Sequence, residues 1–201
     1  MSDAPAETTA SPPPRRIQRR NELLDSTVAL IRRAGPLVSM DRIAAESGVT
    51  KPIIYRYFGD REGLVKEVAC RLVVEFGKEM HQALGPVTGP RDHLRATMDA
   101  FLTVVERETN LYRFINHHTS AERRDLFGRL VAEQFIAELD RRMPTAPPGA
   151  SRTWGYALVG ILHYASDWWT EERTMSRTEL VDHLMSLVWN GLANVGLEGR
   201  T

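Results

Sequence analysis

The chain contains a single cysteine, Cys70, among its 201 residues. One thiol can form neither an internal disulfide nor a multi-cysteine zinc cluster, so both frameworks are excluded. Cys70 lies in an apolar helical pattern, where we expect a small core or boundary residue; a reactive thiol is the alternative.

Long hydrophobic runs are also missing. No stretch approaches the roughly 18 uninterrupted apolar residues that a membrane helix needs, and residues 1–14 lack the apolar stretch of a secretion signal. Hydrophobic residues make up 42% of the chain and charged residues 26%, which is typical of soluble globular proteins. We therefore expect a cytoplasmic protein with a sizeable core and no membrane partner.

The chain has no excess of either charge, with 26 basic and 26 acidic residues. Their distribution is uneven: residues 15–66 hold 11 basic and 6 acidic side chains (net +5), and residues 67–201 hold 15 and 18 (net −3). Such an asymmetry favours a polyanion-binding end attached to a different second region. Solvated helices often carry similar charge, so an ordinary solvated helix surface is the alternative.

Turn-forming residues divide the chain into helical segments. Residues 1–14 contain four prolines and almost no large apolar side chain, which predicts a disordered tail. From residue 15 onward apolar residues recur at helical spacing in eight or nine segments, and no segment alternates with the period of two that a strand requires. We therefore predict an all-α fold without internal repeats.

The most specific stretch is residues 39–64, SMDRIAAESGVTKPIIYRYFGDREGL. Ser39 or Asp41 can cap a short helix, because either side-chain oxygen can accept a free backbone N–H. Gly48 suits the turn that follows, and Thr50 can cap a second helix of about seven residues. Two short helices joined in this way form a helix-turn-helix, whose second helix enters the DNA major groove.

Helical spacing assigns the faces of the second helix. Ile54 and Phe58 are four residues apart and are predicted to turn inward. The residues directed outward are then Lys51 and Tyr55, with Ile53 and Tyr57 as further candidates. Lysine ammonium and tyrosine hydroxyl groups are natural partners of phosphate. From the residues alone, an ordinary corner between two helices with half-buried tyrosines remains the alternative.

Residues 43–64, IAAESGVTKPIIYRYFGDREGL, match the pattern I-A-x-x-x-G-V-[ST]-x-x-x-[LI]-Y-x-[YH]-F-x-x-[KR]-E-x-L. In this pattern residues 17–66 resemble the N-terminal domain of the TetR family of transcriptional regulators. The resemblance implies a homodimer with a three-helix DNA-binding domain (residues 15–66) and a larger helical domain for effector binding and dimerisation (residues 67–201).

The same resemblance implies which residues contact double-stranded DNA: Ser39, Arg42, Thr50, Lys51, Pro52, Tyr55, Tyr57 and Arg61. Pro52 stands where many members have glycine, so an apolar contact is expected there. Arg61 stands where lysine is frequent, and its longer planar head should still reach a phosphate.

Four arginines precede this domain: Arg15, Arg16, Arg19 and Arg20. They can supplement phosphate contacts or enter a minor groove as a flexible arm. A solvated helix start is the plainer alternative.

Residues 67–201 contain no Gly-rich phosphate loop, no nucleophile elbow and no zinc-type histidine pair. We therefore predict no catalytic residue and no cofactor. We also predict no metal site, because the adjacent side chains of His117 and His118 point about 100° apart on a helix and make a poor pair of metal ligands. Aromatic residues are concentrated here, and helix bundles place apolar ligand cavities between helices. The predicted effector, a flexible apolar or aromatic compound, would contact Phe101, Tyr112, Phe114, His118, Phe135 and Trp168.

The last two predicted helices carry apolar stripes wider than a surface helix normally shows. Two such helices from each subunit can form a four-helix interface about a two-fold axis. Packing within one chain is the alternative. The predicted interface residues are Leu158, Ile161, Ala165, Leu180, Leu184, Leu187, Val188, Gly191, Leu192 and Val195.

These features predict a ligand-responsive regulator, and a repressor as its usual form, that binds a palindromic operator as a homodimer. Its recognition helices should lie about 34 to 36 Å apart, and an effector should disturb that spacing. The alternative is a helical small-molecule carrier or interaction module without DNA binding, which the zero net charge supports. No motif identifies the effector, the operator or the controlled genes.

Overall fold

The computed structural model describes residues 14–85, 87, 89–118, 126–142 and 144–190. Within these ranges the chain forms nine helices and no strand, which confirms the predicted all-α fold. The helices are α1 (Pro14–Ala34), α2 (Met40–Glu46), α3 (Lys51–Phe58), α4 (Arg61–Leu84), α5 (Pro90–Arg107), α6 (Thr109–His118), α7 (Leu126–Arg142), α8 (Ala150–Glu172) and α9 (Arg177–Asn190). None of them has both the length and the apolar character needed to cross a bilayer. The predicted disordered tail lies outside these ranges, except that Pro14 begins α1.

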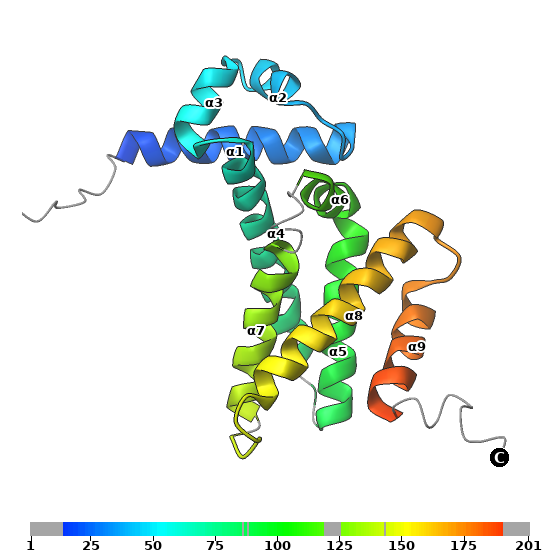
Figure 1. Cartoon of the computed structure of the whole chain (residues 1–201). Coiled ribbons are helices and arrows are strands. Elements are labelled where there is room, and N and C mark those ends of the chain that lie inside the picture. The colour runs from blue at the N-terminus through cyan, green and yellow to red at the C-terminus, as the bar shows by residue number, and fades with distance from the viewer. Residues whose placement is uncertain (1–13, 86, 88, 119–125, 143, 191–201) are drawn as a thin grey trace, which may run out of the picture.

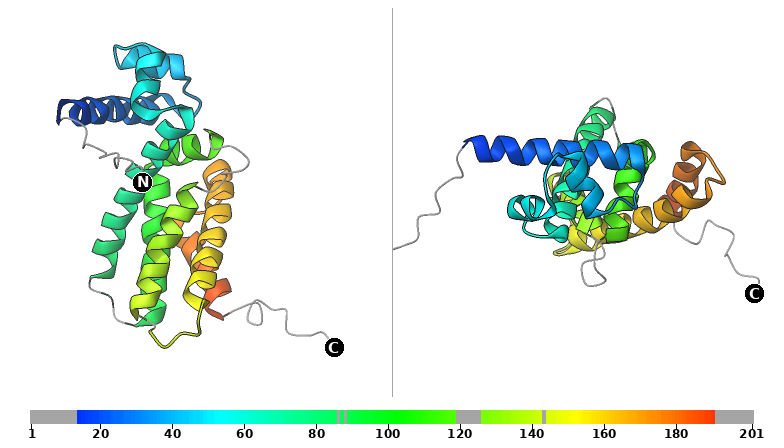
Figure 2. Two further views of the ribbon diagram at one scale, coloured as in Figure 1. Left: turned by 60° about the vertical axis from the view of Figure 1, so that its left-hand side comes forward. Right: turned by 90° about the horizontal axis from the view of Figure 1, so that it is seen from above.

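The helices form a small domain at one end of the molecule and a larger bundle at the other (Figure 1). α2 and α3 lie across α1, and α6 contacts α1 from the side of the bundle. α4 is one unbroken helix of 24 residues that runs from the end of α3 into the bundle. Seen from above, the N-terminal end of α1 extends past α3 (Figure 2).

The small domain has an aliphatic core in which α1 meets α2, α3 and α4. Leu23, Ile31, Ile43 and Ile54 are each at most 1% exposed. Burying each of these side chains contributes about 1.5–3 kcal/mol to folding. The Thr27 hydroxyl is also buried and donates a hydrogen bond to the Leu23 carbonyl oxygen at 2.8 Å, so its polar group has a partner.

Aromatic rings fill the core of the larger domain. Phe76 on α4 stacks on Phe135 on α7 and meets Phe101 on α5 edge-on, with ring centroids 6.0 and 5.9 Å apart. Phe127 then joins Phe101 to Tyr112 on α6, at 5.9 and 5.8 Å. Such ring pairs each add about 0.5–1.5 kcal/mol to the burial of their area. This chain of rings ties four helices together.

Polar contacts fix the small domain to the larger one. Arg32, near the end of α1, donates to both carboxylate oxygens of Glu108, at 2.7 and 2.8 Å. This hydrogen bonding raises the pKa of Arg32. The Asn110 side-chain amide donates to the Arg32 carbonyl oxygen at 2.9 Å. Since the Glu108 side chain is only 9% exposed, solvent screens the pair less than an ordinary surface pair.

Candidate DNA-binding surface and effector cavity

α2, the turn after it and α3 form the predicted helix-turn-helix. Ser39 caps α2, because its hydroxyl accepts a hydrogen bond from the Arg42 N–H at 3.3 Å. Gly48 has a φ of +63°, a left-handed conformation that glycine adopts without steric strain. Thr50 occupies the N-cap position of α3, although its side chain makes no capping hydrogen bond. Pro52 lies in the first turn of α3, where its missing N–H matters little.

α3 has one buried face and one face at the surface. Ile54 and Phe58 are 0% and 8% exposed, as the spacing predicted. Tyr55 and Tyr57 are half-buried and pack against the edge of the core. The Arg56 guanidinium lies 5.6 Å from the centre of the Tyr57 ring. The two tyrosine side chains are therefore partly covered by the core and partly open to solvent.

The other predicted DNA-contacting residues surround α3. The Lys51 Nζ lies 3.0 Å from the Asp41 carboxylate, but Asp41 is 77% exposed, so water screens this pair and a phosphate can replace the carboxylate at little cost. The exposed members of the set are Ser39, Arg42, Thr50, Pro52 and Arg61. The fold thus brings all eight predicted residues to one end of the molecule (Figure 1).

α4 begins very close to the end of α3. Asp60 caps α4 by accepting a hydrogen bond from the Gly63 N–H at 2.7 Å. A β-carbon on Gly63 would lie 1.9 Å from the Phe58 carbonyl oxygen, far inside van der Waals contact, so only glycine fits there. Sequence reasoning missed this requirement. The sequence feature that could have indicated this requirement is a glycine in the first turn of a long helix, where glycine lowers helix stability.

His118, a predicted effector contact, lies at the junction of the two domains. Its Nδ1 lies 3.0 Å from the Phe114 carbonyl oxygen, and its ring stacks on the Phe114 ring with centroids 4.4 Å apart. Burial, followed by the positive charge of Arg61, lowers the pKa of His118. Within the described ranges, no group of three or more potential ligand side chains is placed to hold a metal ion.

A cavity of about 1070 Å³ lies at the end of the bundle remote from α3. The last turns of α4, the start of α5 and parts of α7, α8 and α9 surround it. Its walls are mostly apolar, and its polar side chains include His93, Thr97 and Glu138. The volume lies just above the range of small-molecule sites, about 300–1,000 Å³. The cavity is therefore large enough for a sizeable apolar effector.

Phe135 is the one predicted effector residue that lines this cavity. Trp168 is 40% exposed on α8 and does not line it; neither does His118. Three other residues that were predicted to contact the effector lie in the core instead, and each is at most 1% exposed: Phe101, Tyr112 and Phe114. The sequence identified a concentration of aromatic rings in this domain, but only the packing of the helices decides which ring faces a cavity.

The predicted interface residues fall into separate groups. Four of them line the cavity: Leu158, Ile161, Leu187 and Val188. Leu180 and Leu184 are 3% and 7% exposed inside the single chain, because α9 packs against α5. These two leucines are therefore buried within the subunit, and the alternative of packing within one chain holds for them. Ala165 is half-buried. Gly191, Leu192 and Val195 lie outside the described residues.

An apolar stripe on α8 is only partly covered within the chain, because Trp154, Ala157 and Ile161 line the cavity whereas Tyr164 and Trp168 lie at the surface. Sequence reasoning found only part of this stripe. Its members recur every three or four residues: Trp154, Ala157, Ile161, Tyr164 and Trp168. Tyr164 is 78% exposed, and Trp154 and Trp168 are each 40% exposed. Large apolar side chains that lie exposed along one helix face are typical of an interaction surface. The sequence feature that could have indicated the whole stripe is the spacing of three and four residues between its members.

Two family models match this chain. Residues 23–68 match the model described as "Bacterial regulatory proteins, tetR family". Residues 79–200, more than half of the chain, match the "Tetracyclin repressor-like, C-terminal domain". The chain belongs to the TetR family. As a TetR-family member it is a DNA-binding transcriptional regulator, so the alternative of a carrier without DNA binding is not supported.

Individual proteins show the same TetR-family relationship. An uncharacterized HTH-type transcriptional regulator of Mycobacterium tuberculosis is 33% identical over 186 residues, 90% of this chain and 80% of the relative. The HTH-type transcriptional activator FasR of Mycolicibacterium smegmatis is 27% identical over 189 residues, 90% and 86% of the two chains. The structure of Bacillus subtilis FadR in complex with stearoyl-CoA superposes with a TM-score of 0.62 over 86% of this chain and 98% of that chain, at 15% identity. That last likeness concerns the fold alone.

Proposed function

We propose that this regulator binds a palindromic operator as a homodimer and that an apolar effector in the cavity weakens operator binding. α3 of each subunit would lie in one of two successive major grooves. The observation that carries this proposal is the outward face of α3. It presents Lys51, Tyr55 and Tyr57 at the surface, beside the exposed residues of the turn.

The exposed part of the stripe on α8 supports the homodimer. A second copy can cover the same stripe about a two-fold axis, which removes the exposed rings of Tyr164 and Trp168 from water. Tyr164→Glu should therefore weaken the dimer at least tenfold in sedimentation analysis. Val74→Glu places the same charge on another exposed apolar side chain, on α4, and should leave the dimer intact. Equal behaviour of the two variants would contradict this interface.

The apolar walls of the cavity support a long-chain effector. The FadR structure, which shares the fold, holds stearoyl-CoA, so acyl chains are the first class to test. Trp154 and Trp189 line the cavity, and their fluorescence should change when a ligand displaces water from it. A titration series of acyl-CoA esters, free fatty acids and aromatic compounds tests this class, with Leu158→Trp as the variant that fills the cavity. Equal binding to both proteins would contradict this binding site.

α4 supports coupling between the two sites. It begins at Arg61, a proposed phosphate contact, and its last turns supply Met80 and Leu84 to the cavity wall. An effector that favours one position of these last turns would also favour one position of the helix start. Couplings of this kind are typically about 1–3 kcal/mol.

Selection from a random duplex library tests the operator proposal. We expect an enriched palindrome at moderate salt whose binding weakens when the effector is added. Selection that enriches no palindrome would contradict it. Repression is the proposed output, in line with the description of the C-terminal family model. FasR is named an activator, so a reporter gene placed behind the selected operator is needed to distinguish repression from activation.

A further inference from the structure

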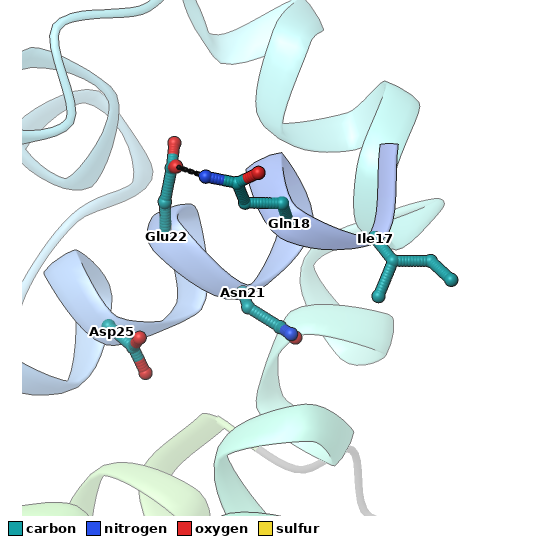
Figure 3. A pocket seen from close by; sticks show the side chains of 5 residues that line it. All are labelled: Ile17, Gln18, Asn21, Glu22 and Asp25. Carbon is teal, nitrogen blue, oxygen red and sulfur yellow. Dashed lines mark hydrogen bonds between the residues drawn. The ribbon is translucent and has the colours of Figure 1, made fainter. Parts of the chain in front are cut away.

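Two hollows in the described part of the chain differ in what they can hold. The shallow one follows a single helix, α1, and Figure 3 shows the side chains that line it: Ile17, Gln18, Asn21, Glu22 and Asp25. The Gln18 amide donates to the Glu22 carboxylate at 3.1 Å, so two of these polar groups already pair with each other. A wall from one helix cannot enclose a molecule. The cavity of the larger domain has walls from five helices, so its polar groups can select a ligand.

His93, near the start of α5, offers this cavity a hydrogen-bond acceptor when its ring is neutral. Its Nδ1 lies 2.6 Å from the Gly89 carbonyl oxygen. That oxygen can only accept, so the hydrogen of the neutral ring is on Nδ1 and the other nitrogen, Nε2, keeps a lone pair. The neutral ring can therefore accept a hydrogen bond from a ligand, but it has no further hydrogen to donate.

Thr97, one turn further along α5, also has only acceptor capacity left. Its hydroxyl donates to the His93 carbonyl oxygen at 2.7 Å, and Thr97 is 7% exposed. A hydroxyl group has one hydrogen and two lone pairs, so this bond uses its only donor. The Thr97 oxygen can then accept a hydrogen bond from a ligand in the cavity.

Glu138, on α7, adds a carboxylate to the cavity wall. Its side chain is 13% exposed and is paired with Arg141, whose side chain is 67% exposed and does not line the cavity. An ionised carboxylate accepts hydrogen bonds and donates none. No lysine or arginine is among the described residues that line the cavity. A carboxylate on a ligand would therefore meet a like charge without a cationic partner of its own, which is unfavourable.

Two tryptophans, Trp154 and Trp189, also line the cavity. Each indole N–H is a neutral donor, which suits a carbonyl oxygen but does not neutralise a carboxylate. The face of an indole ring attracts ammonium groups. The tryptophans therefore favour a neutral or positive ligand over a negative one.

We propose that the effector is an apolar molecule whose head group donates hydrogen bonds, an ammonium or a hydroxyl group, and that the cavity rejects the matching carboxylic acid. This inference rests on the proposed binding of an effector in this cavity. His93, Thr97 and Glu138 accept hydrogen bonds from the head group. Apolar side chains, including Leu94 and Leu139, contact the rest of the molecule. A carboxylate on the same chain leaves these acceptors without a donor and adds repulsion from Glu138.

Ligands that share one saturated chain and differ only in the head group test this selectivity. The series is dodecylamine, dodecanol, methyl dodecanoate and dodecanoate, each titrated into the purified full chain at about pH 7 and followed by tryptophan fluorescence and calorimetry. Dodecylamine and dodecanol should bind about tenfold or more tightly than dodecanoate, because buried acceptors left without donors lower affinity by a factor of this order. A preference for the amine over the alcohol identifies the ammonium as the head group, and equal binding identifies the shared donor.

Glu138→Gln removes the negative charge and supplies an amide donor at the same place. It should raise the affinity for dodecanoate and lower that for dodecylamine, each about tenfold. Asp140→Asn is the matched control, because it makes the same change at an exposed residue of α7 that does not line the cavity. It should leave the order of the four ligands unchanged. Thr97→Val, which removes one acceptor, should weaken dodecanol but not methyl dodecanoate.

The outcomes that would overturn the proposal are distinguishable. If dodecanoate binds the wild type as tightly as dodecylamine and Leu158→Trp blocks both, the cavity binds effectors but does not select a donating head group. If Glu138→Gln and Asp140→Asn give the same order of ligands, Glu138 does not select the head group. If none of the four ligands binds, the proposed effector cavity fails together with this inference.

Discussion

The two domains use the same element, the α-helix, in opposite ways. In the small domain, α2 and α3 are seven and eight residues long, and the groups proposed to bind DNA lie on the outside. In the larger domain, helices of up to 24 residues line a cavity whose walls come from distant parts of the chain. An external site of this kind depends on local spacing and capping. An internal one depends on how five helices pack.

The tryptophans make this contrast measurable. All four of them, residues 154, 168, 169 and 189, lie in the larger domain. Tryptophan fluorescence therefore reports on the unfolding of that domain alone, whereas far-ultraviolet circular dichroism reports on both. A difference between the two transitions measures how independent the domains are.

The largest effect is expected from Ile54→Ala, in the core of the small domain. Ile54 is fully buried, and such truncations lower the free energy of unfolding by about 2–5 kcal/mol. We expect circular dichroism to fall at lower urea concentration than tryptophan fluorescence. Ile53→Ala, the same change at a half-buried neighbour, should have a much smaller effect. Coincident transitions in Ile54→Ala would show that the two domains unfold as one unit.

A smaller effect is expected from Arg32→Ala, at the contact between the domains. The variant leaves the Glu108 carboxylate, 9% exposed, without its bidentate partner, and losses of this kind amount to about 1–3 kcal/mol. The urea midpoints of circular dichroism and fluorescence should then move apart. Arg33→Ala is the matched control, because Arg33 and Glu46 are 61% and 39% exposed and such pairs contribute below about 1 kcal/mol. Equal losses in both variants would refute a special role for Arg32.

Lys51→Ala concerns the external site and should leave folding unchanged. If Lys51 contacts phosphate, the variant weakens binding to all duplexes alike and lowers the salt slope by about one unit. Lys78→Ala, at an exposed lysine of α4 in the larger domain, should keep the wild-type slope. A changed base preference with an unchanged slope would instead assign Lys51 to base recognition.

The smallest effect is expected from the titration of His118. Its pKa is lowered in the folded protein, so as the pH falls below about 6.5 the unfolded chain takes up a proton first. Stability should therefore decrease from about pH 6.5 down to the lowered pKa of the folded state. His118→Gln should reduce the loss of Tm between about pH 7.5 and 5.5 by about 1 °C, whereas His117→Gln should not. An unchanged loss in His118→Gln would contradict this assignment.

Sequence reasoning succeeded where neighbours along the chain decide the outcome. The inward positions of Ile54 and Phe58 follow from a spacing of four residues, and the left-handed turn at Gly48 follows from the residue type. Ser39, one of the two candidate caps, caps α2 because its hydroxyl reaches the Arg42 N–H. Each of these features is settled within about four residues.

Sequence reasoning failed where the partner lies far along the chain. Phe101 and Phe135 look alike in sequence, yet Phe101 fills the core and Phe135 also reaches the cavity. Leu180 and Leu158 both appear as members of an apolar stripe, yet α5 covers Leu180 while Leu158 faces the cavity. Periodicity identifies an apolar face, but it does not identify what that face meets.

The crowded joint at Gly63 has a mechanical consequence. Because the first turn of α4 lies against the Phe58 carbonyl, the recognition helix cannot bend freely relative to α4. α4 has 24 residues and is about 36 Å long, so a tilt of about 5° about its cavity end displaces its other end by about 3 Å. Because this joint is tight, the displacement passes from α4 to α3 without loss. A slight widening of the cavity would then move α3, the helix proposed to contact DNA, by a similar distance.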